Sequence, residues 1–217
     1  MTGTGLSGRI AARAGAAGVP VGCALSDSLA RYVELLVRWN ERMNLTGLTD
    51  DDAGLDRLVV EPLGAVRRLG TGALRLIDIG SGGGSPAVPM KLARPDVRLR
   101  MVESKSRKAA FLREVVRHLG ICGAEVEACR YEQLAARVTD DERADVVTVR
   151  AVRLDEDGFD CLSRLLARGG RLFLFEGQGG DGGAGLGGRF STVQTYRLVE
   201  SLKSRLVVLS LGDEQKA

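Results

Sequence analysis

The chain has 217 residues, 44% of them hydrophobic and 27% charged, which is the composition of a globular protein with room for one substantial core. No apolar run approaches the roughly 18 residues that cross a membrane. We therefore expect a soluble, cytoplasmic protein without a membrane partner. The four cysteines lie far apart without metal-ligand spacing, and His118 is the single histidine. These counts favour reduced thiols and argue against a metal site.

Positive charge is concentrated in one segment of the chain. The net charge is +3, but residues 91–117 contain nine Lys or Arg against three acidic residues, so this segment carries +6 and the remainder −3. Such a concentration is typical of a surface that binds a polyanion, with nucleic acid as the first candidate. A solvated helix face explains the same charges, and charge alone does not decide between the two.

The first 70 residues precede the regular α/β pattern. Residues 1–24 are rich in Gly and Ala without a sustained period, and we predict a disordered tail there. Residues 25–70 are predicted to form a helical cap. Apolar residues recur at helical spacing from 26 to 43, Thr49 and Asp52 form a capping box for a second helix, and Pro62 opens a third.

The stretch around which the rest of the chain is organised begins with a short apolar strand, 75–79, that breaks into a glycine-rich turn. Gly80, Gly82 and Gly84 allow the backbone to take positive φ and to approach a ligand closely. Open α/β sheets bind ligands at the carboxyl ends of their strands, where Asp78 lies. The pattern therefore predicts a cofactor cradle, and a plain strand-to-helix connection is the alternative.

An acidic residue follows the second predicted strand. The strand 97–102 ends at Glu103, about 20 residues after the glycines, which is where dinucleotide sites hold the ribose hydroxyls. By analogy, Glu103 is a candidate for the ribose of another adenosine cofactor. A charge at the N-terminus of the following helix is the alternative, and it does not exclude the first role.

From residue 71 to 217 predicted strands and helices alternate, which implies a parallel sheet. We predict strands over 75–79, 97–102, 125–128, 145–149, 171–175, 193–199 and 205–211, and helices over 86–93, 105–119, 131–138 and 156–168. The glycine run 177–188 predicts a flexible loop, and the five-residue link 200–204 requires the last two strands to pair as an antiparallel hairpin. This predicts the doubly wound, Rossmann-like fold of class I S-adenosylmethionine-dependent methyltransferases and puts a nicotinamide-dependent oxidoreductase second.

The predicted site lacks an obvious general base. No cysteine lies in the loops after the fourth and fifth strands, and His118, near the end of the helix 105–119, fits a capping or dipole role better than catalysis. Guanine N7 carries a lone pair and no proton, so its methylation needs alignment rather than a base. Arg150 is the candidate catalytic residue, positioned to contact the cofactor carboxylate, a substrate phosphate or a guanine edge. A surface ion pair is its alternative.

Several segments match one known family in combination. They are Tyr32…Trp39-Asn40…Asn44-Leu45-Thr46, the cradle from Asp78 to Pro89, Ala93-Arg94-Pro95, Glu103-Ser104…Arg107-Lys108…Phe111-Leu112-Arg113, and Val149-Arg150-Ala151. On these residues the chain resembles, over roughly residues 29–211, the bacterial small-subunit ribosomal RNA guanine-N7 methyltransferases, also called the glucose-inhibited division protein B family.

The resemblance implies methylation of a guanine N7 in 16S ribosomal RNA, free or in the 30S subunit, with S-adenosyl-L-methionine as cofactor. The family's cofactor positions correspond to Gly80, Ser85, Glu103, Ser104, Tyr131, Glu132 and Arg150. The basic residues that flank them are the candidate RNA contacts, Lys105, Arg107, Lys108 and Arg113, with Arg38 and Arg42 of the cap as the next choice. We expect a monomer.

The chain also departs from the family pattern. Ser85 stands where the family has a larger apolar residue, and Ala87 stands in place of Gly. The family's His-x-x-Asp-Ser segment is replaced by Leu58-Val59-Val60-Glu61-Pro62, and Glu176 replaces a common Lys. A methyltransferase that acts on another RNA or on a small molecule is therefore kept as an alternative.

Overall fold

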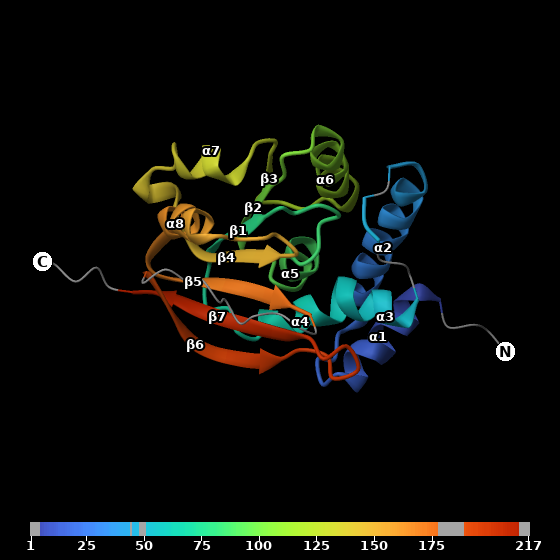
Figure 1. The fold of residues 1–217 in the computed structure, drawn as a ribbon. Helices are drawn as coiled ribbons and strands as arrows, with labels where there is room; N and C mark the ends of the chain where they lie inside the picture. The colour runs from blue at the N-terminus through green and yellow to red at the C-terminus, as the bar shows by residue number, and fades with distance from the viewer. Residues whose placement is uncertain (1–4, 44, 48–50, 178–188, 213–217) are drawn as a thin grey trace, which may run out of the picture.

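The computed structural model describes residues 5–43, 45–47, 51–177 and 189–212. In this part of the chain seven strands form one sheet, in the order β3-β2-β1-β4-β5-β7-β6 (Figure 1). The strands are β1 (Arg75–Ile79), β2 (Arg98–Val102), β3 (Ala124–Glu127), β4 (Ala144–Arg150), β5 (Leu166–Glu176), β6 (Phe190–Arg197) and β7 (Arg205–Leu211). Strands β1 to β5 run parallel, whereas β7 pairs antiparallel with β5 and β6. The predicted fold class, with its C-terminal hairpin, is confirmed.

Helices cover both faces of this sheet (Figure 1). They are α1 (Leu6–Ala16), α2 (Cys23–Met43), α3 (Asp52–Leu55), the π-helix η1 (Asp56–Val60), α4 (Glu61–Val66), α5 (Ala87–Ala93), α6 (Ser106–Leu119), α7 (Tyr131–Ala135), the 3₁₀ turn η2 (Asp140–Glu142) and α8 (Glu156–Leu165). Alternate residues of β1 divide the core. Leu76 belongs to a cluster with α1, α2, α4, α5 and α6, whereas Ile77 and Ile79 pack with α7 and α8. The helices of the predicted cap therefore share one core with the sheet.

The prediction of a disordered tail over residues 1–24 is wrong for residues 6–16, which form α1. Ile10 and Ala14 are fully buried, four residues apart on one face of this helix. Arg13 points from α1 to the buried carboxylate of Asp56 in η1, with its Nε and Nη2 each 2.6 Å from a carboxylate oxygen. Long-range packing gives this segment its order, because an isolated helix of 11 residues is only marginally stable in water even when it is rich in Ala.

The helices predicted after residue 49 are also corrected. Residues 52–66 form one continuous helical run through α3, η1 and α4, with Pro62 inside it rather than opening a separate helix. The start is capped by Asp51, whose side chain accepts a hydrogen bond from the N–H of Gly54 at 2.7 Å. Thr49 lies outside the described residues. The π-helical turn η1 interrupts the α-helical pattern of backbone hydrogen bonds just before Pro62.

The remaining predicted elements are found, β1 and β7 with the predicted bounds and the others with shifted ends. The helix predicted over 156–168 stops at Leu165, because Leu166 already pairs with Ala144 and belongs to β5. The helix predicted over 131–138 is limited to α7. Gly120 closes α6 in the left-handed conformation, as a helix-ending glycine predicts. Of the predicted flexible loop, residues 178–188 lie outside the described residues.

Candidate functional site

The glycine turn after β1 lies at the carboxyl edge of the parallel strands. The N–H groups of Gly80 and Ser81 both donate to the carbonyl of Val102 at the end of β2, at 2.9 and 3.1 Å, so the turn folds over the neighbouring strand. Gly80 and Gly82 have φ values of +67° and +51°. A Cβ on Gly80 would lie 2.6 Å from a methyl group of Val152. Glycine is therefore required at Gly80 by both backbone conformation and space.

Glu103 connects this turn to the start of α6. Its Oε2 accepts the N–H of Gly82 at 2.9 Å, and its Oε1 accepts the N–H of Lys105, the N-cap residue of α6, at 2.8 Å. The side chain is buried. The sequence left open whether Glu103 serves a ribose or a helix N-terminus, and in the structure it joins the helix start to the cradle. Each oxygen retains a further lone pair for a hydroxyl donor.

Asp78 presents an unsatisfied acceptor at the end of β1. Its Oδ1 accepts a 2.6 Å hydrogen bond from Thr148 on β4, whereas its Oδ2 is buried and has no hydrogen-bond partner among the described residues. Burial raises the pKa of Asp78 to about 6, against the opposing effect of the Thr148 hydroxyl. A buried orphan oxygen is costly unless a ligand donor reaches it. This feature fits a cofactor with an amine or hydroxyl group.

Helix α2 packs against the glycine turn of the cradle. The hydroxyl of Tyr32 donates to the carbonyl of Gly83 at 2.7 Å, and Tyr32 itself is fully buried. A Cβ on Gly83 would lie 3.1 Å from Leu36, and one on Gly84 would lie 3.0 to 3.4 Å from Val88, Leu112 and Tyr32. Gly84 is thus a close-packing position against the helices. Tyr32 belongs to the family pattern, which by itself gives this residue no role, and only its packing against Gly83 and Gly84 reveals one.

Arg150, at the end of β4, is held by several partners rather than by one surface ion pair. Its Nη1 donates to the carbonyl of Arg57 at 2.7 Å and to Oγ of Ser85 at 3.1 Å, and lies 3.6 Å from Oε2 of Glu61. Burial lowers the pKa of Arg150, and Glu61 opposes this effect. The next residue, Ala151, has φ of 56°, a strained conformation that is common beside functional groups.

Glu61 was not among the predicted site residues. Its side chain is 6% exposed, and burial raises its pKa although the charge of Arg150 opposes the shift. The sequence offered one signal, a carboxylate inside the apolar run that ends at Pro62. Only the fold brings that carboxylate to the end of β4.

The other predicted cofactor residues follow β2 and β3 at the same edge. Ser104 is exposed at the start of α6. Tyr131 and Glu132 begin α7, with Glu132 exposed and Tyr131 half-buried. The hydroxyl of Tyr131 lies 3.1 Å from the position of a Cβ on Gly158, which places it against the start of α8.

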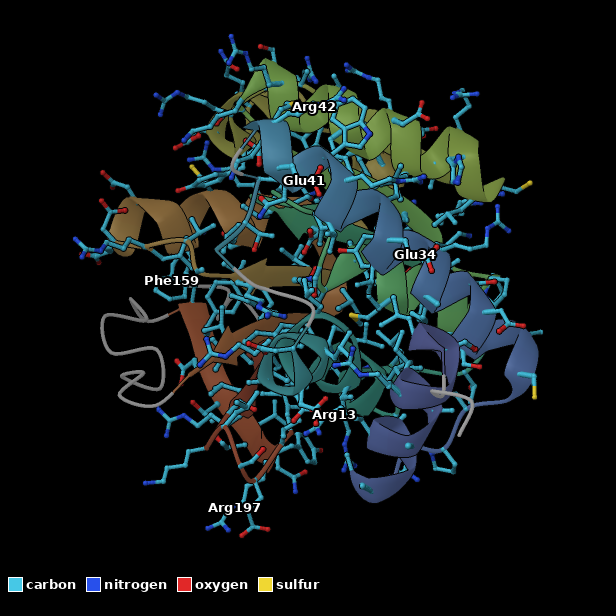
Figure 2. All side chains as sticks on the ribbon, turned by 90° about the vertical axis from the view of Figure 1, so that its right-hand side faces the viewer. Arg13, Glu34, Glu41, Arg42, Phe159 and Arg197 are labelled. Carbon is cyan, nitrogen blue, oxygen red and sulfur yellow. The ribbon has the colours of Figure 1, made fainter. Side chains whose placement is uncertain are left out.

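Of the predicted RNA-binding residues, Lys105 is the N-cap of α6 and the others lie on this helix, which packs against α2 through Trp39 and Phe111 at a ring-centroid distance of 5.5 Å. Lys105, Arg107 and Arg113 are exposed, whereas Lys108 is half-buried. Figure 2 faces the carboxyl edge and shows Arg42 where α2 meets α6. The two groups of basic residues proposed from sequence thus adjoin one another.

Two of the basic side chains on α6, those of Lys108 and Arg113, point toward different parts of the protein. The Nζ of Lys108 lies 4.0 Å from the position of a Cβ on Gly82, so Lys108 reaches toward the cradle. Arg113 donates to the carbonyl of Val126 on β3 at 3.3 Å. Lys105 and Arg107 are therefore the better candidates for a contact with a polyanion.

Within residues 5–43, 45–47, 51–177 and 189–212, no group of three or more His, Cys, Asp or Glu is arranged to hold a metal ion. No helix in that part of the chain combines the length and the apolar character needed to span a membrane.

Solved structures share the fold at low sequence identity. TrmN from Thermus thermophilus aligns with a TM-score of 0.55 and 17% identity, covering 70% of this chain and 49% of its own. A SAM-dependent methyltransferase from Aquifex aeolicus aligns with a TM-score of 0.58 and 14% identity, covering 74% and 93%. These similarities concern the fold alone.

Sequence comparison is more specific. Ribosomal RNA small subunit methyltransferase G of Syntrophotalea carbinolica is 36% identical over 155 residues, which cover 71% of this chain and 70% of the relative. The protein of the same name from Neisseria meningitidis is 33% identical over 169 residues, covering 78% and 79%. The model of the GidB family, described as rRNA small subunit methyltransferase G, matches residues 25–181. The chain belongs to the GidB family of rRNA small subunit methyltransferases.

Proposed function

We propose that this chain transfers a methyl group from S-adenosylmethionine to N7 of a guanine in 16S ribosomal RNA. The observation that carries the proposal is the family match over residues 25–181, because that range contains the cradle, Glu103 and Arg150. Family membership makes the chain an S-adenosylmethionine-dependent rRNA methyltransferase. The choice of N7, the roles of individual residues and a monomeric state are proposals.

The residues at the carboxyl edge fit the cofactor. Asp78 offers a buried acceptor without a partner among the described residues, and Glu103 offers lone pairs beside the backbone of Gly82. We assign both carboxylates to donors of the cofactor, with the glycine turn providing close backbone approach. Ser104, Tyr131 and Glu132 extend the same edge and complete the proposed cofactor contacts. When bound, S-adenosylmethionine supplies an electrophilic methyl group on a cationic sulfur.

The protein's task in this reaction is alignment. Guanine N7 has a lone pair and no proton, so the residues at the edge need not remove one. Arg150 is half-buried and held by the Arg57 carbonyl, Ser85 and Glu61, which makes it a preorganised donor for an acceptor on the base or on a phosphate. Helices α2 and η1 hold the cradle in place, through the hydrogen bond from Tyr32 to the Gly83 carbonyl and the one from Ser85 to the Leu58 carbonyl.

The test is methyl transfer from labelled S-adenosylmethionine to naked 16S RNA and to 30S particles, followed by borohydride and aniline cleavage to map N7-methylguanine. We expect label in 16S RNA and one cleavage position. Label at another atom would refute the N7 assignment while leaving rRNA methylation intact. Transfer to a small molecule but to neither RNA preparation would refute the substrate assignment.

A further inference from the structure

Pro62 removes a hydrogen-bond donor from the middle of a helical run. In an α-helix the N–H of residue 62 would bond to the carbonyl of Leu58, four residues earlier, and in a π-helix it would bond to the carbonyl of Arg57, five residues earlier. Proline has no N–H, so it satisfies neither carbonyl. The run nevertheless continues through Pro62, from η1 into α4.

Those two carbonyls are the ones that the methyltransferase site uses. The carbonyl of Leu58 accepts a hydrogen bond from Oγ of Ser85 at 2.8 Å, and the carbonyl of Arg57 accepts one from Nη1 of Arg150 at 2.7 Å. The same Nη1 also donates to Oγ of Ser85 at 3.1 Å. Ser85, Arg150 and the two carbonyls therefore form a closed network against the helix.

Pro62 and Ser85 are both departures from the family pattern, and the structure joins them. Pro62 withholds a backbone donor from the carbonyls of Arg57 and Leu58, and Ser85 supplies a side-chain donor to the Leu58 oxygen. We propose that Pro62 and Ser85 act as a coupled pair of positioning residues, which together fix the guanidinium of Arg150 at the methyl-transfer site.

A physical consequence follows for each member of the pair. Without the Ser85 hydroxyl, the Leu58 carbonyl loses that donor and Arg150 loses one of its acceptors. With an N–H at position 62, the helix itself supplies a donor to one of the two carbonyls. In the spacing that Glu61 keeps with Asp56, five residues earlier, that carbonyl is the one of Arg57, where the N–H competes with Arg150, so Ser85 no longer acts on a guanidinium fixed in the same way. The effect of removing the hydroxyl must then depend on which residue occupies position 62, which is the signature of coupling.

The experiment is a double-mutant cycle of Ser85→Ala with Pro62→Ala, repeated with Pro62→Ser. Its activity measurements rest on the proposed function. We expect Ser85→Ala to lower kcat/KM for 16S methylation about tenfold in the native background and less than about twofold in either position-62 background. Ser85→Thr, which keeps a hydroxyl, should retain kcat/KM within about threefold.

Two matched controls address simple loss of structure. Ser163→Ala removes a buried hydroxyl that donates to a helix carbonyl in α8, 2.7 Å away, and Pro95→Ala removes an exposed proline before β2. Both should leave kcat/KM unchanged. If Ser85→Ala lowers kcat/KM by the same factor in all three backgrounds, the coupling is refuted. It is also refuted if Ser85→Thr lowers kcat/KM as much as Ser85→Ala does.

A stability arm separates this proposal from the proposed function. The thermal midpoint should fall by about 2 to 4 °C for Ser85→Ala in the native background and by much less in the Pro62→Ala background. If the wild type does not methylate 16S RNA, the proposed function fails. The thermal midpoints of the variants still measure the coupling between Pro62 and Ser85 in that case. Additive midpoint shifts would refute the pair even in an active enzyme.

Discussion

Asp78 combines two properties that rarely occur together, full burial and an oxygen with no partner among the described residues. Because burial raises its pKa from the ordinary 3.8 to about 6, this group stabilises the unliganded fold below about pH 4, and that contribution is lost as the pH rises through about 6. A ligand that donates to the orphan oxygen prefers the ionised form.

We therefore predict that the affinity for S-adenosylhomocysteine increases as the pH rises from 5 to 7, with the change centred near 6. Asp78→Asn should bind at least about tenfold more weakly and lose this dependence, because it has no carboxylate to ionise. Calorimetry at several pH values measures both effects. The same pH profile in the variant and the wild type would remove Asp78 from the cofactor site.

Gly82 provides a second prediction at the residue scale. A Cβ there meets no atom closer than 3.6 Å, so Gly82→Ala introduces backbone strain of about 1 kcal/mol and places a methyl group beside the cradle. Gly120→Ala is the matched control, since Gly120 has a similar φ of +63° with no atom within 4 Å of its Cβ position.

Both variants should lose similar stability in urea unfolding. Only Gly82→Ala should weaken S-adenosylhomocysteine binding, because only Gly82 borders the proposed cofactor. Affinities that fall equally in the two variants would trace the loss to backbone strain and not to the cradle.

At the scale of elements, α1 is joined to η1 by one ion pair that matters for stability. The Arg13 side chain is 29% exposed and that of Asp56 only 4%. We expect Arg13→Ala to lower the free energy of unfolding by about 2 to 3 kcal/mol, because it leaves a buried carboxylate without its bidentate partner. Arg117→Ala, which breaks the exposed pair with Glu114, should cost less than about 1 kcal/mol.

Urea unfolding of the two variants checks this difference. The same experiment tests whether α1 belongs to the cooperative unit, since a change in the slope with denaturant would report separate unfolding of α1. Equal small losses in the two variants would show that α1 contributes no more than a surface contact.

For the whole molecule, the prediction concerns which edge faces RNA. Lys105→Glu with Arg107→Glu should weaken 16S RNA binding and reduce the salt slope by about 1 for each lost phosphate contact, while S-adenosylhomocysteine affinity stays constant. Arg98→Glu with Arg168→Glu makes the same change in net charge at exposed positions near the amino ends of β2 and β5.

Filter binding at several salt concentrations compares the two double variants. The second should retain the wild-type salt slope, because the amino edge lies opposite the cradle. Equal weakening in both would mean that only total charge matters, and no change in the first would move the RNA surface from α6 to Arg38 and Arg42 on α2.

The sequence alone determined the parts of this protein that depend on local pattern. The strand before the glycine turn, the left-handed glycine that ends α6 and the antiparallel hairpin each follow from apolar runs, turn residues or link length, and the structure has all of them. Asp78 and Glu103 were identified because they end strands, and strand ends in a parallel sheet meet at one edge.

Tertiary structure decided what depends on partners far away in the chain. Helix α1 has little intrinsic tendency to form and becomes ordered through Ile10, Ala14 and the Arg13 pair with Asp56. Pro62 reads in sequence as a helix start, yet it lies inside a helical run because Ser85 and Arg150, distant in sequence, donate to carbonyls that it leaves unsatisfied. A side chain's role in such a network is a property of the folded arrangement, since no local pattern encodes which distant donor will reach it.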